Sequence, residues 1–150
     1  MQARTIEVLK SMIEVLNDRL EGYEKVSLPV EENRDIEDML LEGRSVSYYC
    51  REELRNAIVM LGGNPVEGRA LPSDSYHAWT KISSTSPDNY RKNLFSVFEV
   101  GEHATQKAYE HALKNNLLPD SIRRLLTRQK QKFQKQYTHI MRLSKAEAKK

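Results

Sequence analysis

Apolar residues recur at alternating spacings of three and four along most of the chain, the pattern typical of amphipathic helices. In the first segment these positions are Ile6, Leu9, Ile13, Leu16, Leu20 and Tyr23. Pro29 ends the segment, because proline lacks the amide proton that a helix interior requires. A second stripe of apolar and small residues occupies 33–61 and stops at GGNP, residues 62–65, where Gly62 or Gly63 suits a left-handed C-terminal cap.

The second half of the chain predicts two further long helices. The first follows the sequence SSTSPD, with Ser86 as the N-cap and Pro87 at the first helical position, and it runs to about Asn115. The second runs from about Pro119 to Leu143. No strand-like alternation of apolar and polar residues interrupts this pattern, so the fold class is expected to be all-α.

The stretch from residue 62 to residue 86 is too long for a tight turn. Within it, SDSYHAWTKI predicts a short helix that packs Trp79 onto the rest of the domain. Two helix hairpins joined by one long connection indicate a ferritin-like four-helix bundle of two antiparallel hairpins, with a short helix in the crossover. We expect a single domain over residues 1–143 and a frayed basic tail over residues 144–150.

Composition narrows the class of protein. The chain has 150 residues, of which 39% are hydrophobic and 30% charged, enough for one soluble domain with a real core. No apolar run approaches the ~20 residues of a membrane span, and the N-terminus lacks a signal-peptide core, so a cytoplasmic location is expected. Cys50 is the only cysteine, which excludes an intrachain disulfide and a thiolate cluster. Its apolar neighbours predict a buried, inert thiol.

Glu102 is the one carboxylate placed squarely inside an apolar stripe, in FSVFEVGEHATQKAYEHAL, residues 95–113. A buried carboxylate without a partner is costly, so some group must compensate it. Gln129 and Gln136 occupy core positions of the last helix where leucine is expected, and they bracket the depth of Glu102. The sequence therefore predicts a buried polar network of Glu102, Gln129 and Gln136.

The alternative for Glu102 is a metal site. A ferritin-like di-iron centre uses two Glu-x-x-His pairs, and the chain contains none. Helical phase also puts Glu21 on the solvent side, with Glu42 and Glu99 at stripe edges. An all-carboxylate site of Glu21, Glu42, Glu99 and Glu102 that binds Fe, Mn or another oxygen-preferring cation stays an alternative, although no cofactor is otherwise expected.

A net charge of +3 conceals a strong asymmetry along the chain. Residues 1–63 hold 8 Lys/Arg against 13 Asp/Glu, whereas residues 121–150 hold 10 against 1. The basic side chains of the last helix are Arg123, Arg124, Arg128, Lys130, Lys132, Lys135 and Arg142. This patch could be a solvated face, a contact in a homo-oligomer, or a sequence-blind nucleic-acid surface. The lack of interleaved aromatic residues disfavours nucleic acid.

Several longer motifs carry a family resemblance. The sequences EGYE, LLEGRS, ELRNAIVMLGGNP, HAWTKI, FEVGEHATQKAYEHAL and RRLLTRQ resemble those of a bacterial family of ferritin-like four-helix-bundle proteins catalogued as a domain of unknown function. The resemblance covers about residues 5–143. It implies the fold and a bacterial, cytoplasmic setting, with Glu21, Glu42, Glu99, Glu102 and Gln129 at matching positions.

The resemblance implies no reaction, and the chain itself offers no phosphate-binding Gly loop, nucleophile elbow or metalloprotease His pair. Without a base, an orienting group and a shared cleft, the sequence does not indicate an enzyme. We therefore expect a non-catalytic structural or interaction role, with a stress-related role suggested by the family setting alone. A ferroxidase-like metal-binding protein is the alternative.

Overall fold

The computed structural model describes residues 2–25, 34–65, 77–79 and 90–148. Its four long helices are α1 (Gln2–Glu24), α2 (Arg34–Met60), α4 (Tyr90–Leu113) and α5 (Asp120–Ala148). No strand occurs within these ranges, which confirms the all-α prediction. Residues 77–79 are helical, while the rest of the predicted crossover helix and the predicted helix start at Ser86 and Pro87 lie outside the described residues.

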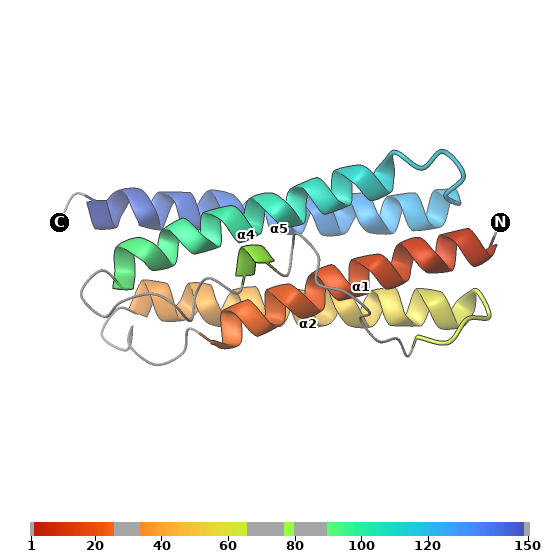
Figure 1. The fold of residues 1–150 in the computed structure, drawn as a ribbon, viewed down its shortest axis with the longest axis horizontal. Coiled ribbons are helices and arrows are strands. Elements are labelled where there is room, and N and C mark those ends of the chain that lie inside the picture. The colour runs from red at the N-terminus through yellow and green to blue at the C-terminus, as the bar shows by residue number, and fades with distance from the viewer. Residues whose placement is uncertain (1, 26–33, 66–76, 80–89, 149–150) are drawn as a thin grey trace.

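The helices form two antiparallel hairpins that lie against each other (Figure 1). Helix α1 packs on α2 and α4 packs on α5, and the hairpins meet through α2 with α5 and α1 with α4. Helices α1 and α5 are therefore diagonally opposite in the bundle. None of the helices in the described ranges combines the length and the apolar character that a membrane span needs.

The helix ends follow local sequence signals. Gly62 adopts a φ of 84°, and the amides of Gly62 and Gly63 donate to the carbonyls of Val59 and Ile58, both at 2.9 Å. This is the left-handed cap that the GGNP sequence predicts, at a φ that glycine adopts without a Cβ penalty. At the other end of the chain, α5 continues to Ala148. Residues 144–148 are thus helical, and the predicted frayed tail is wrong for them.

The apolar core is divided into two clusters along the length of the bundle. One contains Leu16, Cys50, Tyr109 and Phe133, and the other contains Leu40, Phe98, Trp79 and Ile140. On each long helix a buried polar side chain separates the two: Arg19 on α1, Ser47 on α2, Glu102 on α4 and Gln136 on α5. The bundle therefore has a polar layer between two apolar layers.

Candidate functional site

Arg19 is the centre of the polar layer. Its side chain is fully buried, and its guanidinium reaches all three other helices. Nε donates to Ser47 Oγ of α2 at 2.8 Å, Nη1 forms an ion pair with Glu102 Oε2 of α4 at 2.5 Å, and Nη2 donates to Gln136 Oε1 of α5. One side chain of α1 thus fixes the position of α2, α4 and α5 relative to itself.

The Glu102 carboxylate is compensated within the same layer. Its Oε1 accepts a hydrogen bond of 2.6 Å from the hydroxyl of Tyr23, and its Oε2 faces Arg19. Tyr23 follows Arg19 by one helical turn, so both side chains lie on one face of α1. Burial, reinforced by the negative charge of Glu102, raises the pKa of Tyr23 well above its ordinary value, so the phenol stays protonated and donates.

The Arg19 guanidinium also stays protonated. Burial acts to lower its pKa, but the attraction of Glu102 outweighs that effect, and the pKa lies above the ordinary arginine value. The guanidinium of the layer therefore stays protonated, and it faces the Glu102 carboxyl group. Ser47 supports it by donating its own proton to the Gly43 carbonyl at 2.6 Å, which leaves its oxygen to accept from Arg19.

Aromatic rings enclose the guanidinium. Its central carbon lies 4.4 Å from the Phe133 ring centroid, 5.0 Å from that of Tyr23 and 5.7 Å from that of Trp79, distances at which a cation is attracted to a ring face. Tyr23 also stacks on Phe98 at 4.7 Å between centroids. These rings exclude water from the ion pair, which strengthens its electrostatic attraction.

Glycines make room for the largest rings. A Cβ on Gly101 would lie 2.6 Å from the Trp79 ring, and a Cβ on Gly22 would meet the same ring at 2.6 Å. A Cβ on Gly43 would lie 2.2 Å from Tyr23. The glycines therefore allow aromatic side chains to pack closely beside the polar layer. Trp79 is buried in the core, as the sequence predicts.

Gln129 belongs to a separate polar cluster, so the predicted network of three residues is divided in two. The Gln129 Oε1 accepts from the Tyr109 hydroxyl at 2.7 Å, and its Nε2 donates to the Cys50 carbonyl at 3.1 Å and to Glu53 Oε1 at 3.2 Å. Gln136 reaches Glu102 only through Arg19. Glu102 has two partners, the Arg19 guanidinium and the Tyr23 hydroxyl. The prediction that a glutamine amide compensates Glu102 directly is therefore wrong.

The proposed metal ligands do not come together. Glu21, Glu42 and Glu99 are exposed, and only Glu102 is buried. Within the described part of the chain, no group of three or more His, Cys, Asp or Glu side chains is placed to hold a metal ion. The Arg19 guanidinium also lies 2.5 Å from the buried Glu102 carboxylate, where it would repel a metal cation. These residues therefore do not fit a ferritin-like metal centre.

Three basic side chains of α5 contact α2 or the end of α4 within the same chain. Arg123 donates to the carbonyls of Leu113 and Asn115 at 2.7 and 2.6 Å, which caps the end of α4. Arg128 forms an ion pair with Glu53 of α2, and Lys130 lies 4.0 Å from Glu110 of α4. The remaining basic residues of the patch are Arg124, Lys132, Lys135 and Arg142, all exposed. Nucleic-acid binding by this reduced patch stays a prediction.

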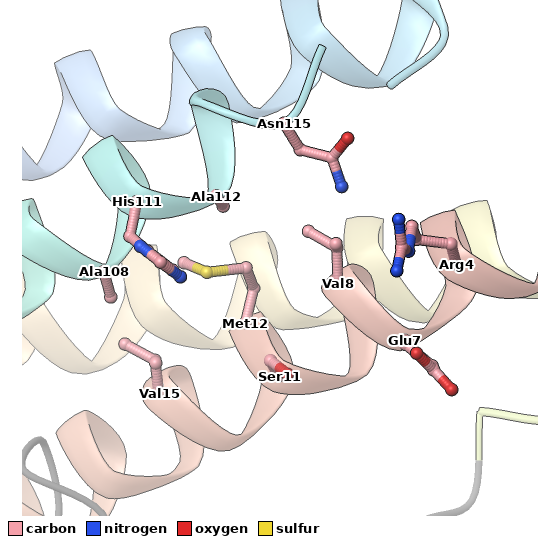
Figure 2. A pocket seen from close by; sticks show the side chains of 10 residues that line it. All are labelled: Arg4, Glu7, Val8, Ser11, Met12, Val15, Ala108, His111, Ala112 and Asn115. Carbon is pink, nitrogen blue, oxygen red and sulfur yellow. The ribbon is translucent and has the colours of Figure 1, made fainter. Parts of the chain in front are cut away.

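A hollow of about 370 Å³ opens between α1 and α4 (Figure 2). Its lining residues are Arg4, Glu7, Val8, Ser11, Met12, Val15, Ala108, His111, Ala112 and Asn115. None of the residues of the polar layer belongs to this lining, so the hollow gives no access to Arg19 or Glu102. None of its polar side chains is buried, and its volume is at the low end for small-molecule sites.

Cys50 is buried at the interface of α2 and α5, as the sequence predicts. Burial raises the pKa of its thiol to about 11. The thiolate needed for nucleophilic attack is therefore scarce at neutral pH, which fits a packing role.

Sequence reasoning missed Arg19, although a signal for it exists. Leu9, Met12, Leu16, Arg19 and Tyr23 continue the three-and-four spacing of α1, so Arg19 occupies a core position as clearly as Glu102 does. Two opposite charges in two core stripes predict an ion pair, because either one alone would be buried without compensation.

The fold and the polar layer together define an all-α helical protein whose centre is a closed ion pair. The chain belongs to the family described as a domain of unknown function (DUF2383), whose family model matches residues 4–115. The matched region includes Arg19, Ser47 and Glu102, while Gln136 lies beyond it. No curated protein sequence matches the chain.

Proposed function

We propose that this protein is a ferritin-like four-helix bundle with a structural or interaction role and no catalysis at its centre. The observation that carries this proposal is the compensation of Glu102 by Arg19 and Tyr23. In ferritin-like di-iron proteins, inward-facing glutamates and histidines bind the metals. Here a guanidinium supplies the positive charge, and aromatic rings occupy the surrounding space.

The helix order supports the ferritin-like attribution. Two antiparallel hairpins are joined by a crossover between α2 and α4, which Figure 1 shows running in the same direction. The bacterial and cytoplasmic setting and a stress-related role rest on the family resemblance, and the single buried cysteine is compatible with a reducing compartment.

A metal challenge tests the absence of catalysis. Purified, tag-free protein and the Glu102→Gln variant are incubated with Fe(II) and, separately, with Mn(II) in air, and bound metal and iron oxidation are measured. We expect neither stoichiometric metal nor accelerated oxidation in either protein. Stoichiometric metal that is lost in Glu102→Gln would make Glu102 a ligand and would refute the proposal.

A further inference from the structure

Helix α5 presents a row of positive side chains to the solvent. At 3.6 residues per turn, their positions fall within about 80° of the helix circumference, on the side turned away from the bundle core. At 1.5 Å per residue the row is about 27 Å long. We call it the basic row, and its members are Arg124, Lys132, Lys135 and Arg142, all exposed.

The fold makes no use of these four charges. None of them belongs to an ion pair within the described part of the chain, whereas Arg128, which lies among them, pairs with Glu53 of α2. Cations three or four residues apart on a helix repel each other, as Lys132 does with Arg128 and Lys135. No acidic residue occurs from 121 to 146 to offset this repulsion. The basic row therefore lowers helix stability without making an internal contact, which points to an anion outside the chain.

The charge of the other helices gives the molecule a single attractive side for a polyanion. Helix α5 holds eight Lys/Arg against two Asp/Glu. Helix α1, diagonally opposite in the bundle, holds three against five, and α2 holds four against six. A large anion is therefore attracted to α5 and repelled from the opposite edge, which orients it on the basic row.

The residues between the cations are neutral hydrogen-bonding groups. Thr127, Gln131 and Gln134 are exposed on the outer side of α5, and such side chains join Lys and Arg in contacts to phosphate oxygens. None of the large apolar residues exposed in the described ranges lies on α5. Protein interfaces are enriched in aromatic residues and depleted in lysine, and a helix on a membrane surface needs an exposed apolar face. The composition of this face thus favours a phosphate backbone over a protein or a membrane.

The same face favours a duplex over a single strand. Proteins hold single strands by stacking bases on aromatic side chains, and the two phenyl-type rings of α5, Phe133 and Tyr137, are buried and half-buried. A row of about 27 Å spans about eight base pairs of a duplex, which carry about 16 phosphate charges. Every cation of the row therefore has a phosphate within reach of its long side chain.

We propose that the basic row of α5 binds the phosphate backbone of double-stranded nucleic acid without reading its sequence. This inference rests on the proposed interaction role and names the chemical class of its partner. Each of the four cations neutralises one phosphate and releases its condensed counterion. The strength of binding therefore depends steeply on salt.

The salt dependence of binding counts these contacts. Fluorescence anisotropy follows a labelled DNA duplex of mixed sequence and about 20 base pairs, titrated with the protein from about 50 mM to about 200 mM salt. Four neutralised phosphates predict a slope of log affinity against log salt of about −3.6, which is a loss of about 150-fold over this range. The variant K132Q/K135Q has two contacts left, so we expect a slope of about −1.8 and a loss of about 12-fold.

The matched control is R4Q/K10Q, which removes the same charge from α1, diagonally opposite α5. It should keep the wild-type slope, and circular dichroism checks that both variants are folded. No binding of the duplex at about 50 mM salt, an unchanged slope in K132Q/K135Q, or an equal change in R4Q/K10Q would overturn the inference. A single strand of the same length bound as tightly as the duplex would also overturn it. Each of these results leaves the metal challenge unaffected, so a failure of this inference is distinguishable from a failure of the proposed function.

Discussion

The buried ion pair leads to a quantitative prediction about stability. Removing one partner of such a pair strands the other charge in the core and costs about 3–5 kcal/mol. We therefore expect Glu102→Gln, which keeps the shape and leaves Arg19 uncompensated, to lower the free energy of unfolding by about that amount. Arg19→Met should have a similar cost, because it removes the cation that faces the Glu102 carboxylate and leaves it the hydrogen bond from the Tyr23 hydroxyl.

The double variant Arg19→Met/Glu102→Gln separates the pair from its parts. It contains no buried charge at this site, so its loss of stability should be at least about 2 kcal/mol smaller than the sum of the two single losses. For a domain of this size each kcal/mol shifts the Tm by about 2–4 °C, so the single variants should melt about 6–20 °C lower than the wild type.

Urea unfolding measures all four free energies of the cycle. Helix content is followed by circular dichroism, and Trp79 fluorescence reports the polar layer itself, because Trp79 is the single tryptophan and lies beside the Arg19 guanidinium. Arg55→Met is the matched control. Arg55 pairs with Glu52 at 3.1 Å with both side chains more than a third exposed, so its loss should cost at most about 1 kcal/mol.

Two results would refute this reasoning. If Glu102→Gln costs no more than the Arg55→Met control, the buried charge is not a determinant of stability. If the two single losses add up in the double variant, Arg19 and Glu102 do not act as a pair, whatever their separation.

Three further predictions concern other parts of the fold. Because the pKa of Cys50 is raised, its contribution to stability is present below about pH 9 and is lost as the pH rises through about 11; Tm measured from pH 8 to 11 should fall more steeply in the wild type than in Cys50→Ala. Gly101→Ala should cost about 1–3 kcal/mol and shift Trp79 emission, because the added Cβ would overlap the ring. Arg123→Ala should cost about 1.5–3 kcal/mol in urea unfolding by freeing two carbonyls, whereas exposed Arg124→Ala should change stability by less than about 0.5 kcal/mol.

The four helices can be predicted from the sequence because the signals that define a helix lie within the helix and next to its ends. Spacings of three and four, the glycines after Met60 and the apolar stripes are all properties of neighbouring residues. The same periodicity identifies Glu102 as a buried carboxylate. These features need no knowledge of which helix packs against which.

The partners of Glu102 could not be predicted in the same way. Arginine is usually exposed, and its long side chain can carry the charge to the surface, so a core-facing Arg19 is not recognised from its own helix. Gln129 and Gln136 have the same residue type and both face the core. Which polar cluster each glutamine joins depends on how far α5 is shifted along its axis relative to α1 and α2. The spacing of apolar residues within one helix gives no information about that shift.

The connections of Arg19 also bear on how the chain folds. Its partners Ser47, Glu102 and Gln136 lie 28, 83 and 117 residues away in the sequence. Among the described residues, the carboxylate that pairs with this guanidinium comes from α4, and the guanidinium that pairs with Glu102 comes from α1. Neither hairpin can form the compensated pair alone, so the cluster favours a single cooperative transition over stepwise assembly of independently stable halves.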